Sequence, residues 1–211
     1  MPTSALAAPK SVVSGFKIFV WVSLGLTTLF VVVTSELYLI IDYPMYHAYR
    51  LQVTADRHLL IPHTLAGTFA LLIGPVNFSS RFRKQHLKLH RILGKIYVIS
   101  VFIGAATGVA LASGRPGFPG TSMQATAWVV CTTAAFITAR NRHVVPHRQW
   151  MARSYAVTFT FVSSRVLNLW PRYWSHLGDS FSAVGVIAFT LVSLLIVDLG
   201  LNWRELTARR A

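Results

Sequence analysis

Two histidine phrases of the same form stand at the start of two apolar stretches in this chain. Residues 86–91 read His-Leu-Lys-Leu-His-Arg, and residues 143–148 read His-Val-Val-Pro-His-Arg. Neutral imidazoles are common ligands of haem iron and of transition metals. Histidines at the ends of membrane helices therefore raise the question of whether His90 and His147 bind a cofactor.

The residues that follow each second histidine form a helical face. His147 shares its face with Met151, Ser154 and Thr158, at spacings of three and four. The face after His90 consists mostly of small residues, which leave room for a flat group beside the helix; its members are Gly94, Tyr97, Val101, Gly104 or Ala105, and Gly108.

Two imidazoles from neighbouring helices could hold a haem iron from both sides. Both helices run outward from the same side of the membrane, so His90 and His147 lie at similar depth. Arginine side chains nearby could pair with the propionates, and Gly94 would make room for the macrocycle. Tyr97 and Tyr155 could pack or hydrogen-bond at its edge. The arginines in question are Arg91, Arg148 and Arg153.

Other interpretations of the same residues remain open. Small residues on membrane helices commonly serve close helix packing, and an interfacial His-Arg pair can contact lipid phosphates. A copper or zinc ion bound by His90 and His147 is a third possibility. His86 and His143 are expected in loops, because Pro146 fits a first helical turn and disfavours helix before it.

A second group of candidates lies toward the other side of the membrane. His63 follows a proline at the start of a span, and Met123 could be its partner in a second axial pair. Arg165 lies within the fifth span, five helical turns beyond His147 on the same face. An arginine within a span indicates a polar partner or cavity, here a propionate, Glu36 or the helix ends of the second span.

The elements that must position these residues are membrane helices. The chain has 211 residues, of which 54% are hydrophobic and only 12% charged, and apolar windows of about 20 residues recur along it. The single cysteine, Cys131, cannot form an intramolecular disulfide. The expected spans are Phe16–Ile40, Leu59–Ser79, Ile92–Ala112, Ser122–Ala139, Met151–Trp170 and Ala183–Leu201.

The basic residues indicate how these spans are oriented. The net charge is +14, and 15 of the 20 lysines and arginines fall on one side if the spans alternate. This asymmetry is the positive-inside pattern, with both termini cytoplasmic, so it reports topology and not nucleic-acid binding. We expect a place in a bacterial cytoplasmic membrane, with a basic rim suited to anionic lipid headgroups.

Together these patterns predict an all-α integral membrane protein with six transmembrane helices. Residues 1–211 form a single membrane domain, in which the second to fifth spans (59–170) build an antiparallel four-helix core. Segments 16–40 and 183–201 flank this core. The glycine- and proline-rich stretch at 114–120 makes the outer turn between the third and fourth spans.

A string of motifs within this core resembles an uncharacterised family of multi-pass membrane proteins that carry a domain of unknown function. The similarity runs from Leu59 to Trp170 and implies no particular activity. Its motifs are His63-x-x-x-Gly67, Gly74-Pro75-x-x-Phe78, His90-Arg91-x-x-Gly94-x-x-Tyr97 and His147-Arg148-x-Trp150-Met151-x-Arg153-Ser154-Tyr155-Ala156.

A looser architectural similarity is to the six-helix b-type cytochromes that pass electrons across membranes. It implies a bis-histidine haem b between the third and fifth helices, where His90 and His147 lie, while the fourth span lacks the histidine of a second pair. We therefore expect an electron-transfer subunit or membrane oxidoreductase with a redox partner. The alternative is a non-redox membrane protein, either a partner subunit or a carrier of lipids or small molecules, whose histidines have structural or lipid-contact roles.

Overall fold

The computed structural model describes residues 22, 25–26, 28–30, 56–168 and 180–207, and its regular elements in these ranges are all helical. This confirms the all-α class. In chain order the main helices are α4 (Arg57–Phe78), α5 (Ser80–Gln85), α6 (Leu87–Ala112), α7 (Phe118–Arg140), α8 (Val144–Asn168) and α10 (Ser180–Thr207).

The helices extend beyond the apolar windows that predicted them. α6 begins at Leu87 instead of Ile92, and α8 begins at Val144 instead of Met151. The more polar residues that precede each apolar window also adopt the helical backbone. Pro146 lies in the first turn of α8, where its missing N–H costs nothing. As a result, His90 and His147 are each the fourth residue of their helices.

A short helix that the hydropathy pattern did not predict separates α4 from α6. α5 spans six residues, and its first turn is capped by Ser79, whose hydroxyl accepts a hydrogen bond from the Phe82 amide at 3.2 Å. Its sequence carries two arginines and a lysine. The basic segment between the second and third spans is thus an ordered turn of helix.

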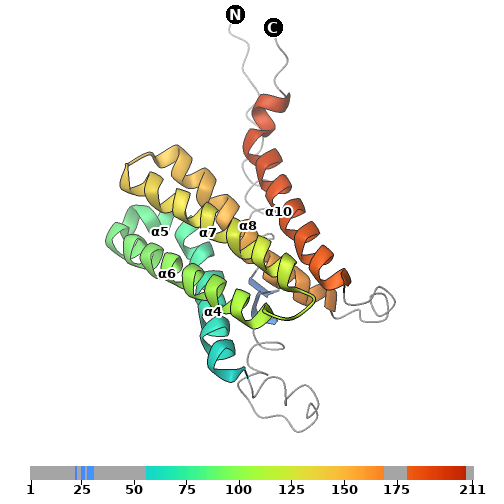
Figure 1. The fold of residues 1–211 in the computed structure, drawn as a ribbon. Helices are drawn as coiled ribbons and strands as arrows, with labels where there is room; N and C mark the ends of the chain where they lie inside the picture. The colour runs from blue at the N-terminus through green and yellow to red at the C-terminus, as the bar shows by residue number, and fades with distance from the viewer. Residues whose placement is uncertain (1–21, 23–24, 27, 31–55, 169–179, 208–211) are drawn as a thin grey trace, which may run out of the picture.

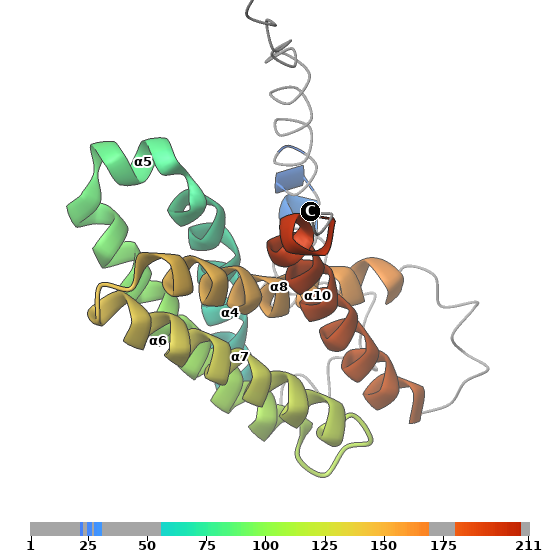
Figure 2. The same cartoon turned by 90° about the horizontal axis from the view of Figure 1, so that it is seen from above.

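Four helices pack in a closed ring. α4 lies against α6, α6 against α7, α7 against α8, and α8 against α4, while α10 covers α7 and α8 from one side (Figures 1 and 2). Residues 113–117 and 141–143 make tight connections, so α6, α7 and α8 alternate in direction. Gly114 in the first connection adopts a φ of 73°, which glycine tolerates without strain.

Among the described residues, three helices are long and apolar enough to cross a membrane, namely those of residues 57–78, 87–112 and 183–203. The six-span prediction is therefore confirmed only as a helical membrane architecture with three candidate spans. α7 and α8 are less apolar because hydroxyl residues recur in both sequences and α8 also contains three arginines. The first predicted span, 16–40, lies almost wholly outside the described residues.

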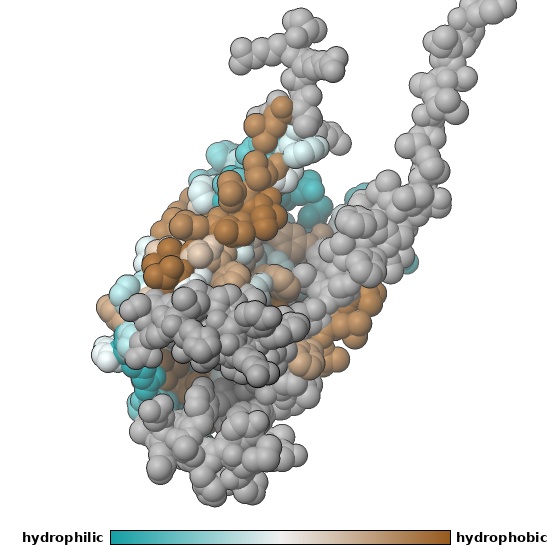
Figure 3. Space-filling model, turned by 90° about the vertical axis from the view of Figure 1, so that its right-hand side faces the viewer, coloured by the Kyte–Doolittle hydropathy of each residue, from teal (hydrophilic) through white to brown (hydrophobic). Residues whose placement is uncertain are grey.

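The candidate spans turn apolar side chains outward. α4 exposes Leu65, Phe69, Leu72 and Val76, at helical spacing along one stripe, and Figure 3 shows a broad apolar surface on the α10 side of the molecule. Large exposed apolar surfaces on long helices are the surfaces that contact lipid. The exposed apolar residues of α6 and α10 include Ile92, Ile96, Ile99, Ile103, Leu191, Leu195, Ile196 and Leu199.

Candidate functional site

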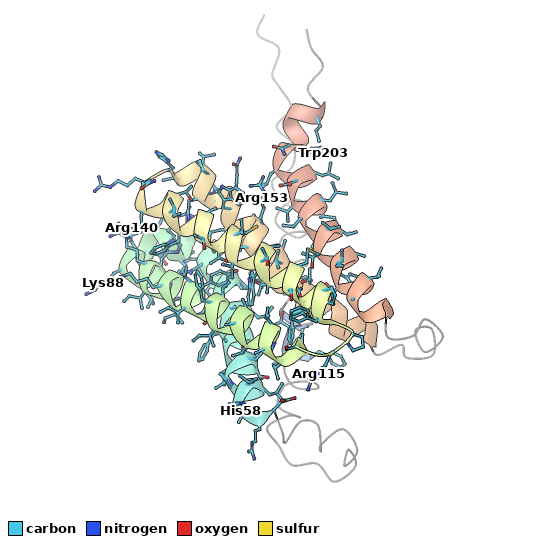
Figure 4. All side chains as sticks on the ribbon, viewed as in Figure 1. His58, Lys88, Arg115, Arg140, Arg153 and Trp203 are labelled. Carbon is cyan, nitrogen blue, oxygen red and sulfur yellow. The ribbon has the colours of Figure 1, made fainter. Side chains whose placement is uncertain are left out.

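Both histidine phrases lie at the same end of the bundle, which we call the histidine end. Here α5, the start of α6, the end of α7 and the start of α8 meet. Figure 4 places Lys88 and Arg140 at this end, and Arg115 and His58 at the opposite one. The structure thus brings together the two phrases that the alternation of spans assigned to one side.

His147 is held in an orientation suited to ligation. Its Nδ1 lies 2.8 Å from the backbone oxygen of Ala135 in α7. Because a carbonyl oxygen can only accept a hydrogen bond, this contact assigns the proton to Nδ1. The lone pair of Nε2 is then the basic one, which is the arrangement that metal-ligating histidines use.

His90 is partly buried and lies near His147 at the same end. The two imidazoles are close enough to interact electrostatically, and Arg83 and Arg91 also act on His90. The Nδ1 of His90 is buried, and within the described part of the chain it has no hydrogen-bond partner. A buried polar atom without a partner is costly. This nitrogen could therefore still form a stabilising hydrogen bond.

Asn77, near the end of α4, is a residue that the sequence analysis did not consider. It is 7% exposed, and its Oδ1 likewise lacks a partner among the described residues. Gly94 lies one helical turn after His90, and Nδ2 of Asn77 lies 3.9 Å from the position that a Cβ would occupy on Gly94. In the sequence, an amide residue near the end of an apolar span was the signal that could have identified Asn77.

Tyr97 lies two turns deeper along α6 than His90 and is fully buried. Its hydroxyl shares hydrogen bonds with Ser154 at 2.8 Å and Thr158 at 2.9 Å, both on α8. Trp128 of α7 donates from Nε1 to Thr158 at 2.8 Å, and Thr132 of α7 bonds Ser154 at 2.7 Å. This hydroxyl network joins three helices below the histidines, and the contact of Tyr97 with a cofactor stays a prediction.

Tyr155 is engaged with α4. Its hydroxyl donates to the carbonyl oxygen of Leu71 at 3.2 Å, an oxygen left without its helical donor because Pro75 has no N–H. The ring occupies the space beside Gly74, where an added Cβ would lie 2.1 Å from a ring carbon. Phe78 packs edge-on against the same ring, with centroids 5.5 Å apart. The Gly74-Pro75-x-x-Phe78 motif is thus a socket for Tyr155.

The arginines expected near propionates divide into two groups. Arg91 and Arg148 are exposed at the histidine end. Arg153 instead donates from Nε to Asp198 of α10 at 2.7 Å, and its guanidinium lies 4.9 Å from the ring centroid of Trp150. Its role toward a propionate stays a prediction, and the side chain of Arg165 lies outside the described part of the structure.

His63 lies away from the other two histidines and contacts α6 farther along. Its Nδ1 lies 2.9 Å from the Gly104 oxygen and 3.2 Å from the Thr107 hydroxyl. Its ring fills the space beside Gly108, and Trp128 fills the space beside Gly104. These two glycines therefore serve helix packing, and a His63–Met123 axial pair stays a prediction.

The described residues contain no cluster of three or more histidine, cysteine or acidic side chains that could hold a metal ion. A protein site for a bare zinc ion normally supplies three or four ligands. Haem brings four nitrogens of its own, so two histidines complete its coordination. The two histidines at the histidine end would thus suffice as the protein ligands of a haem, and haem binding stays a prediction.

Comparison with known proteins gives one match. The family model described as "Predicted membrane protein (DUF2306)" covers residues 60–200, well over half of the chain. No curated protein and no solved structure matches, so the similarity to b-type cytochromes stays a prediction. The match confirms the resemblance carried by the histidine, glycine and tyrosine motifs, and the chain belongs to this family of membrane proteins with a domain of unknown function.

Proposed function

We propose that this protein is a membrane-embedded b-type haem protein that takes part in electron transfer. His90 and His147 supply the axial ligands at the histidine end, on the cytoplasmic side of a six-span bundle. The observation that carries the proposal is that two imidazoles on separate helices lie near each other at one end of the bundle, one of them fixed through Nδ1 by the Ala135 carbonyl. The electron donor and acceptor would be a redox partner or a partner subunit.

The surroundings of the two histidines support this function. α4, α6, α7 and α8 pack in a ring, the partly exposed histidines lie at one end of it, and the Tyr97 hydroxyl network closes the interior below them. Such a site excludes bulk water on the membrane side, and ligand identity, hydrogen bonding and burial are what a protein uses to adjust a haem potential. Arg91 and Arg148 supply positive charge at the rim for two propionates.

An absorption spectrum tests the proposal directly. Protein expressed with haem available and purified in detergent should show a Soret band at near-stoichiometric intensity, with sharp low-spin α and β bands after dithionite. The His90→Ala and His147→Ala variants should each lose the low-spin spectrum, because one axial ligand is missing. Added imidazole should restore it in either variant.

His143→Ala is the matched control. His143 belongs to the same repeated phrase, and its side chain is exposed just before α8, so its removal should leave the spectrum unchanged. Circular dichroism and thermal unfolding of each variant would show that the fold persists. A folded wild-type protein that takes up no haem under these conditions would refute the proposal.

A non-redox membrane protein is the second candidate, and one observation favours it. Side chains of the protein itself, Trp128 and His63, fill the space beside Gly104 and Gly108, which is the packing role common for small residues in membrane helices. In that case His90 and His147 would have structural or lipid-contact roles. Unchanged spectra and lowered thermal stability in both alanine variants would support it.

A further inference from the structure

Two buried atoms of the histidine end have complementary hydrogen-bonding chemistry, and neither has a hydrogen-bond partner in the part of the chain that the structure describes. They are Nδ1 of His90 on α6 and Oδ1 of Asn77 on α4. These helices pack directly against each other, and the Asn77 amide lies beside Gly94, one turn from His90. An imidazole nitrogen can carry a proton and donate it, whereas an amide oxygen can only accept.

We propose that Asn77 is the positioning residue for His90. Its Oδ1 accepts the Nδ1 proton of His90 through one bridging water, and thereby presents the lone pair of Nε2 to the bound group. This inference rests on the proposed haem function and adds a residue to it. The Ala135 carbonyl performs the same task for His147, so each histidine would have one acceptor, both supplied by helices other than its own.

The absence of a side chain at position 94 is part of the same arrangement. A Cβ there would be in ordinary van der Waals contact with Nδ2 of Asn77, at 3.9 Å. Position 94 thus places the Asn77 amide beside α6, one helical turn from His90. Partners of this kind orient a ligating histidine and raise its basicity.

The test compares two variants at position 77 with one variant at a control position. Asn77→Leu keeps the size of the side chain but removes the acceptor, whereas Asn77→Asp keeps an acceptor and adds charge. Thr64→Val is the matched control, because Thr64 is also buried on α4 with an unpartnered oxygen but lies far along the helix from Asn77.

We expect Asn77→Leu to lower haem affinity by about 10- to 100-fold, the usual effect of losing such a partner. Asn77→Asp should retain affinity and lower the reduction potential, because a carboxylate makes the imidazole a stronger donor to iron. Thr64→Val should match the wild type. In haem-free protein, nitrogen NMR of labelled histidines should show His90 protonated at Nδ1 in the wild type and in Asn77→Asp, but less so in Asn77→Leu.

The outcomes separate this inference from the function on which it rests. If the wild type binds haem and Asn77→Leu changes neither affinity, potential nor the His90 tautomer, the positioning role of Asn77 is wrong and the haem function stands. If the wild type binds no haem, the proposed function fails. An Asn77→Leu protein that merely unfolds earlier, with the His90 tautomer unchanged, also counts against the positioning role.

Discussion

At the scale of single residues, glycines with the same place in a sequence pattern have different surroundings. Gly67 and Gly74 lie on α4 two turns apart. A Cβ on Gly67 would meet nothing within 4 Å, whereas a Cβ on Gly74 would collide with the Tyr155 ring. Their spacing of seven residues places both glycines on one face of the helix, but it could not tell which side chain lies beside each, because that side chain comes from a distant helix.

The Gly74→Ala substitution should destabilise the protein. Tyr155 is buried and held between Leu71 and Phe78, so it cannot move away easily, and overpacking of this kind costs about 1–3 kcal/mol. Thermal unfolding in detergent would measure the loss. Gly67→Ala on the same helix is the control. It should be neutral or slightly stabilising, since alanine is more favourable than glycine in a helix by up to about 1 kcal/mol. Equal effects of the two substitutions would contradict the packing of Tyr155 against Gly74.

At the scale of helices, the sequence predicted the core helices and their order but not all of their contacts. Apolar windows located both ends of α4 and the end of α6 closely, because residues facing lipid must be apolar. They placed the starts of α6 and α8 too late, since polar residues can continue a helix outside the hydrocarbon. The partners of Arg153 and Tyr155 depend on which helix faces which, and a single sequence does not contain that information.

The contact between α8 and α10 should depend on the Arg153–Asp198 pair. Arg153 is only 21% exposed, and its Nε lies 2.7 Å from the carboxylate. The test uses the single variants Asp198→Asn and Arg153→Gln and the double variant that carries both substitutions. The free energy of unfolding of each variant is compared with that of the wild type. We expect the double variant to be more stable than the sum of the single losses indicates, with a coupling of about 0.5–3 kcal/mol.

The Arg115–Asp56 pair provides the control for this cycle. It lies at the opposite end of the bundle, and its arginine is 51% exposed. Exposed ion pairs contribute about 0–1 kcal/mol, so the same double-variant cycle there should give little coupling. Additive losses at Arg153 and Asp198 would mean that the α8–α10 pair is not a stabilising contact.

At the scale of the whole molecule, the fold assigns the two ends of the bundle to opposite sides of the membrane if α6 and α7 both cross it. Single cysteines introduced at Gln85 and His143, in a chain where Cys131 is replaced by alanine, should react with a membrane-impermeant reagent from the cytoplasmic side only. A cysteine at Pro116, in the connection between α6 and α7, should react only from the other side.

This experiment also decides the number of spans around the core. α7 is not among the helices that are apolar enough to cross by composition alone, but it packs against α6, α8 and α10 and exposes the apolar side chains of Val130, Phe136 and Ile137. Labelling of positions 116 and 143 from the same side would show that α7 does not cross. Labelling of position 85 from the non-cytoplasmic side would contradict the charge-based orientation.

The pairing of Arg153 with Asp198 has a consequence for how the protein is made. α10 is the last helix of the described chain to leave the ribosome, and its carboxylate would be expensive in lipid by itself. α8 precedes it by a few dozen residues and already carries the matching guanidinium. α10 can therefore insert into the membrane with Asp198 already paired to Arg153. A chain that lacks Arg153 should accumulate with α10 incompletely inserted and accessible to proteases.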